Sequence, residues 1–81
     1  MYQAITLNIN IMKSLTHIST GIDEGNNTYK HVRVQDFTGS KTRVTNTYFF
    51  NGKKTTKHLR FTVESWFSNN FDCELETIQK Y

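Results

Sequence analysis

The sequence predicts a small α+β domain, in which a four- to five-stranded antiparallel sheet carries one short helix packed on one face. Apolar and polar residues alternate with period two along most of the chain, as expected of half-buried strands. Short turn signals separate these runs, and short connections join antiparallel neighbours. One stretch near the C-terminus changes to the helical period. The 81 residues correspond to a single domain, residues 1–81.

The first two strands are predicted from alternation alone. The first begins in the run Ile5–Ile11 and is expected to continue through Leu15 towards Ile22. Asp23–Thr28, with the sequence DEGNNT, is a turn, and Tyr29–Phe37 alternates again as the second strand.

A tight hairpin is predicted at the centre of the chain. Thr42–Phe50 is the third strand, and Asn51-Gly52 is a strong two-residue hairpin signal because both residue types tolerate positive φ. The returning fourth strand is expected over Lys54–Phe61. The hairpin would then extend over residues 41–61.

The helix and the last strand complete the order β-β-β-β-α-β. Val63, Trp66 and Phe67 have helical spacing, so a helix is expected over Thr62–Asn70. Thr62 would be its N-cap, and Glu64 would lie in its first turn. Alternation resumes in the last predicted strand, Phe71–Tyr81.

The sequence predicts that the protein is not an enzyme. Asp72, Glu74 and Glu76 share one strand face, a pattern typical of a solvated edge strand rather than of a catalytic cleft. Cys73 lies two residues before Leu75 and shares its strand face, so it is expected to be a structural thiol rather than a nucleophile. The three histidines and one cysteine lack ligand spacing, and no glycine-rich nucleotide motif is present, so neither metal nor cofactor is expected.

The cysteine count and hydropathy point to a reducing, cytoplasmic environment. One cysteine excludes an intramolecular disulfide. Neither a secretory signal nor an apolar run that could span a bilayer is visible, so no membrane partner is expected.

Charge is concentrated in the middle of the chain. Residues 30–60 carry eight basic groups against one acidic group, whereas residues 61–81 carry one basic and four acidic groups. Such a basic block attracts phosphates or an acidic protein face. Basic and aromatic residues of this block are the candidate binding residues: Arg33, Arg43, Tyr48, Phe49, Lys53, Lys54, Lys57 and Arg60.

Two kinds of partner fit these residues. A basic hairpin with exposed aromatics can bind single-stranded DNA or RNA, where stacking contributes about 1–3 kcal/mol per base. The same surface can press against a protein, where aromatic and arginine anchors dominate. Either Tyr48 or Phe49 is expected to face outward beside Arg43 and the lysines at the hairpin tip, because strand parity exposes only one of them.

A resemblance favours the protein partner. The matching residues are Gly39-Ser40-Lys41, Arg43-Val44 with Asn46, Asn51-Gly52-Lys53, and Phe61 with Glu64–Phe67, with a faint further match in Ser14–Thr20. In these residues and in the order of elements, about half of the chain resembles a small phage anti-CRISPR protein of the type I-F inhibitor kind. That family ends in a longer helical segment, whereas this chain is expected to end in a strand.

The resemblance implies inhibition by occlusion. Such a protein binds a Cas protein subunit of the host CRISPR surveillance complex and stops the guide from pairing with target DNA. The tyrosines and glutamate that make the family's contacts are replaced here by His17, by Gln35 or Asp36, and by Thr45, so those contacts do not carry over. The basic middle third excludes a DNA mimic and implies steric blocking, with DNA or RNA contact as an open alternative. The chain is expected to be a monomer or weak homodimer, because exposed sheet edges permit a dimer.

Overall fold

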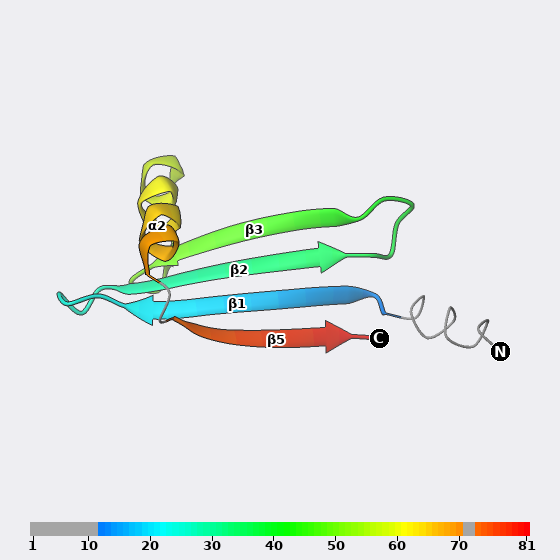
Figure 1. Ribbon diagram of the computed structural model, residues 1–81. Coiled ribbons are helices and arrows are strands. Elements are labelled where there is room, and N and C mark those ends of the chain that lie inside the picture. Colours follow the sequence, from blue (N-terminus) through cyan, green and yellow to red (C-terminus); the bar gives the residue numbers. More distant parts are fainter. Residues whose placement is uncertain (1–11, 71–72) are drawn as a thin grey trace.

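A computed structural model describes residues 12–70 and 73–81 of the chain. Within these residues, five strands and one helix follow one another in this order: β1 (Ser14–Ile22), β2 (Thr28–Asp36), β3 (Arg43–Phe50), β4 (Lys53–Lys54), α2 (Lys57–Asn69) and β5 (Glu74–Lys80). The strands form one antiparallel sheet with the order β4-β3-β2-β1-β5 (Figure 1). The α+β fold class expected from the sequence is therefore confirmed. The run Ile5–Ile11, expected to open the first strand, lies outside the described residues.

The turn between β1 and β2 is organised by one carboxylate. Asp23 Oδ1 accepts hydrogen bonds from the backbone N–H groups of Gly25 (2.8 Å) and Asn27 (2.9 Å). Its Oδ2 accepts from Asn27 Nδ2 (3.1 Å) and from the hydroxyl of Tyr29 (2.8 Å). The hydrogen bond from Tyr29, followed by those from Asn27, lowers the pKa of Asp23. The turn thereby fixes the position of a core aromatic ring.

The predicted hairpin turn between β3 and β4 is confirmed. Asn51 and Gly52 both adopt positive φ, 52° and 82°. Asn51 also joins this turn to the β1–β2 turn, since its Oδ1 accepts from the N–H of Thr28 (2.8 Å) and its Nδ2 donates to Asn27 Oδ1 (3.1 Å). The two turns are therefore held together at one end of the sheet.

The expected fourth strand is wrong beyond Lys54. After the hydrogen bond from Thr55 N–H to the carbonyl of Tyr48, the chain leaves the sheet and begins α2 at Lys57. The helix therefore starts five residues earlier than expected. Thr56, not Thr62, occupies the N-cap position, without a side-chain cap hydrogen bond, and Glu64 lies in mid-helix.

Two contacts of Arg60 accompany this early start. Its Nε donates to Glu64 Oε1 at 3.0 Å, a pairing at i, i+4, and its guanidinium lies 5.0 Å from the Tyr48 ring centroid. Both contacts place residue 60 on the helix, one turn before Glu64. In the sequence KTTKHLRF, Leu59 alone continues the helical spacing of Val63 and Trp66, and this single apolar residue did not reveal the start.

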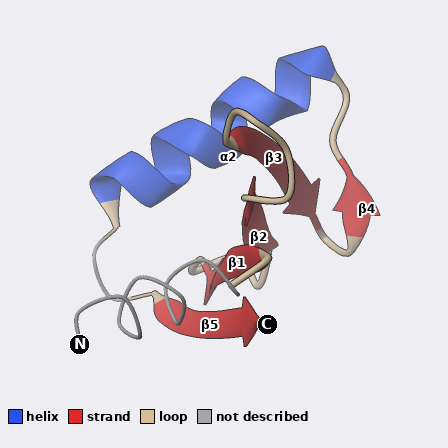
Figure 2. Cartoon of the chain, turned by 90° about the vertical axis from the view of Figure 1, so that its right-hand side faces the viewer, coloured by secondary structure: helices blue, strands red, loops and turns tan. Residues whose placement is uncertain are grey.

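An aromatic core joins α2 to one end of the sheet. The helix crosses the strands on one side of the sheet, at the end occupied by the two turns (Figures 1 and 2). Trp66 stacks on Tyr29 at 4.2 Å, and the Phe50 ring meets Tyr29 edge-on at 5.4 Å. Val63 is fully buried. Gly21 lies directly beneath the Trp66 ring, where a Cβ atom would sit 2.2 Å from Cη2.

The opposite face of the sheet has no covering layer in the part of the chain that the structure describes. We call it the open face. The strand register assigns to it alternate residues of each strand. Its central members are Thr16, Ile18, Val32, Val34, Thr45, Thr47, Glu76 and Ile78. No helix among the described residues has the length and apolarity needed to cross a membrane.

Candidate binding surface

The sheet register places the binding residues expected from the sequence on two different faces of the sheet. Phe49 pairs with both Lys30 and Lys54, so these three side chains share the open face. Phe50 pairs with Lys53, which places Lys53 on the face that carries α2. The two adjacent lysines of the hairpin therefore point to opposite sides of the sheet.

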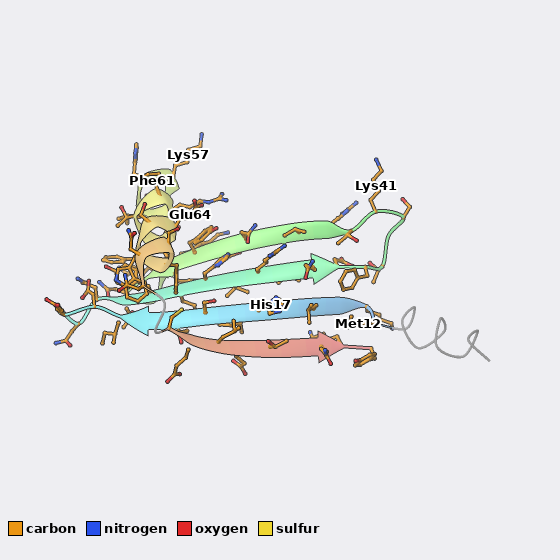
Figure 3. All side chains as sticks on the ribbon, viewed as in Figure 1. Met12, His17, Lys41, Lys57, Phe61 and Glu64 are labelled. Atoms are coloured by element: carbon orange, nitrogen blue, oxygen red, sulfur yellow. The ribbon has the colours of Figure 1, made fainter. Side chains whose placement is uncertain are left out.

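The remaining candidates lie elsewhere. Arg33 is on the helix-bearing face, and Arg43 is on the open face at the far end of β3, about 20 Å from Phe49 at 3.3–3.4 Å per residue. Lys57 and Arg60 belong to α2. Figure 3 shows Lys41 and Lys57 at opposite ends of the strands. The expected single surface, with Arg43 beside the lysines of the hairpin tip, is therefore wrong.

Tyr48 is a packing residue rather than an outward anchor. Its ring stacks on His31 at 4.4 Å, and Arg60 covers it from α2. Burial, with a further contribution from the Glu64 carboxylate, raises the pKa of Tyr48. Phe49 lies on the open face, away from α2, and is the aromatic residue of β3 that is available for binding.

A row of five side chains crosses the open face at the turn end. It contains one residue from each strand, in the order Lys54, Phe49, Lys30, Thr20 and Glu74, and we call it the tip row. The Lys30 ammonium lies 5.2 Å from the Phe49 ring centroid, within the range of a cation–π interaction. The row is therefore basic and aromatic over β2–β4 and acidic at β5.

A hollow of about 610 Å³ adjoins the tip row. Phe49, Lys30 and Glu74 line it, together with Ile22 from the end of β1 and Trp66 from α2. A mainly apolar lining with a few charged groups is typical of a binding site.

Sequence reasoning missed one pairing and one exposed residue. Lys30 belongs to the tip row, but only the strand register reveals its pairing with Phe49. Phe61 lies on the outer side of α2 and is 72% exposed. A helix predicted from residue 57 onward would have placed Phe61 on the side of the helix opposite the buried Val63.

The described residues contain no group of three or more His, Cys, Asp or Glu side chains placed to hold a metal ion. Glu74 and Glu76 lie on the exposed edge strand β5, as their spacing predicts. Cys73 is half-buried and free.

Comparisons with known proteins identify no relative of this chain. No family model matches the chain, and neither a curated protein nor a solved structure matches it significantly.

Proposed function

We propose that this protein is a non-catalytic inhibitor that binds an RNA-guided type I surveillance complex and sterically blocks its access to target DNA. The observation that carries the proposal is the tip row, in which a half-buried aromatic ring lies between two lysines on the open face, a face that no described element covers. The resemblance of residues 39–67 to a type I-F inhibitor supplies the class of target.

The physical properties of the open face support a protein partner. Its centre is lined by Ile18, Val32 and Val34, and desolvating apolar surface of this kind stabilises association. Phe49 supplies the rigid aromatic anchor on which binding energy concentrates. Lys30 and Lys54 at the rim favour an acidic partner surface and accelerate encounter.

A second candidate function is binding of single-stranded nucleic acid. It is favoured by the same arrangement, because a base can stack on Phe49 while Lys30 and Lys54 reach the flanking phosphates. A few phosphate contacts would make this binding weaken steeply with added salt.

Two binding assays on one sample separate these functions. The first measures target-DNA binding by a purified type I-F surveillance complex with and without the protein. The second measures binding of labelled single- and double-stranded DNA to the protein alone at about 0.15 M ionic strength. The inhibitor function predicts that the complex loses target binding while free DNA is ignored. Binding of free DNA without an effect on the complex would contradict it and support the second function.

A further inference from the structure

We infer that β5 is a self-association edge, through which two copies of this chain pair antiparallel about Ile78 into one continuous sheet. Within the described residues, no strand pairs with the outer side of β5. Every residue of this strand is exposed. A seven-residue edge that no described strand covers presents the backbone groups that a further strand needs.

Hydrogen bonds already present determine which backbone groups of β5 face outward. At one end of the β1–β2 pair the N–H of Asp23 donates to the carbonyl of Asn27, and at the other the N–H of Phe37 donates to the carbonyl of Lys13. Both bonds extend the register, so odd-numbered residues of β1 bond to β2. The backbone groups of even-numbered β1 residues therefore bond to β5, where each even-numbered β1 residue pairs with an even-numbered β5 residue. The N–H and C=O groups of Leu75, Thr77 and Gln79 consequently point away from the sheet.

Pairing about Ile78 satisfies these outward groups. Thr77 then faces Gln79 of the second copy, and Leu75 faces Tyr81 of the second copy. Each of these pairs occurs twice by symmetry, which gives about eight backbone hydrogen bonds. Ile78 faces its own copy at a non-hydrogen-bonded position, where cross-strand side chains approach most closely.

The side chains agree with this register. Leu75, Ile78 and Tyr81 are 64%, 37% and 62% exposed in the single chain, and all three gain an apolar partner. Glu76 faces Lys80 of the second copy on both sides of the axis, so the only charges directly opposite each other are of opposite sign.

Other registers match less well. An axis at Glu76 would place the two Glu76 carboxylates opposite each other, which is destabilising. An axis at Thr77 pairs Glu74 with Lys80 but leaves Ile78 opposite Glu76. Charges on an edge strand usually discourage pairing with foreign strands. Here the order of charges along β5 disfavours the axis at Glu76 and favours antiparallel pairing with a second copy about Ile78.

Sedimentation velocity of the full chain from about 1 µM to 1 mM tests this inference. We expect a concentration-dependent monomer–dimer equilibrium. Lys80→Glu and Glu76→Lys should each weaken dimerisation about tenfold, because either change sets two like-charge pairs across the axis. The double variant should restore dimerisation, because it exchanges the signs within each pair. Rescue distinguishes pairing from a general loss of stability.

Glu74→Lys is the matched control. It makes the same charge change two residues away, at a position that has no described residue opposite it in this register, and should leave the dimer unchanged. A chain that stays monomeric up to 1 mM would overturn the inference. Weakening by Glu74→Lys with rescue by Lys80→Glu would also overturn it, because that result places the axis at Thr77.

Discussion

The close approach of Trp66 to Gly21 makes Gly21→Ala the sharpest test of the core. A Cβ at this position would lie 2.2 Å from Cη2 and 2.5 Å from Cζ3 of the indole ring. Both distances are far inside van der Waals contact, and the near atoms belong to a rigid ring. The methyl group must therefore push Trp66 away from β1, which also disturbs its stacking on Tyr29.

The size of the effect follows from this displacement. Adding a methyl group to a packed site typically costs about 1–3 kcal/mol of unfolding free energy. A domain of this size loses roughly 4–8 °C in Tm per kcal/mol, so the variant should melt roughly 5–20 °C below the parent chain.

Thermal unfolding followed by far-UV circular dichroism measures the loss. Fluorescence of Trp66, the single tryptophan, reports its displacement. Gly39→Ala is the control, since the nearest atom to its added Cβ would be 3.6 Å away, an ordinary contact. A Gly21→Ala variant as stable as the Gly39→Ala variant, with unchanged Trp66 emission, would refute the packing of the Trp66 ring against Gly21.

Three further predictions concern stability. Val63→Ala should cost about 2 kcal/mol in urea unfolding, because a side chain that is fully buried among the described residues loses two methyl groups. A cost below about 0.5 kcal/mol would contradict its burial. Asn51→Ala should lower the Tm more than Asn51→Gly. Both variants lose the side-chain hydrogen bonds of Asn51, but only alanine also incurs the steric penalty of positive φ. Equal losses in the two variants would contradict the turn geometry. The pKa of Asp23 is lowered in the folded state, so its stabilising contribution is present above the unfolded pKa, near 3.8, and is lost as pH falls through the folded value. A pH series of Tm should therefore show a shallower acid decline for Asp23→Asn than for the parent chain, and parallel curves would contradict the hydrogen bonds assigned to Asp23.

Local chemistry made the strands and the hairpin predictable from the sequence. Asn51-Gly52 supplied the positive φ values that a two-residue turn requires, and alternation placed β2 and β3 within one residue of their observed bounds. The start of α2 was missed because Lys57–Arg60 contains only one apolar residue, Leu59, while Arg60 contributes a cation–π contact and an ion pair that hydrophobic periodicity does not reveal.

The binding surface was predicted only in part, because face assignment depends on register. Tyr48 and Phe49 are equally suitable aromatics in the sequence, and only the contact of Tyr48 with α2 removes it from consideration. Lys53 and Lys54 likewise look equivalent until their cross-strand partners are known. A one-residue shift in pairing would exchange every one of these assignments.

Lys53 and Lys54 lie on opposite faces of the sheet, and this difference gives the most direct test of the open face as the contact surface. Lys54→Glu and Lys53→Glu make the same charge change at neighbouring positions, and both residues are exposed, so each should leave the fold intact. The measurement is the concentration of protein that half-inhibits target-DNA binding by a type I-F surveillance complex. If the open face is the contact surface, Lys54→Glu should weaken inhibition about tenfold, because it replaces a favourable charge contact of about 1–1.5 kcal/mol. Lys53→Glu, on the opposite face, should change inhibition little. Equal weakening by both variants, or greater weakening by Lys53→Glu, would contradict the account.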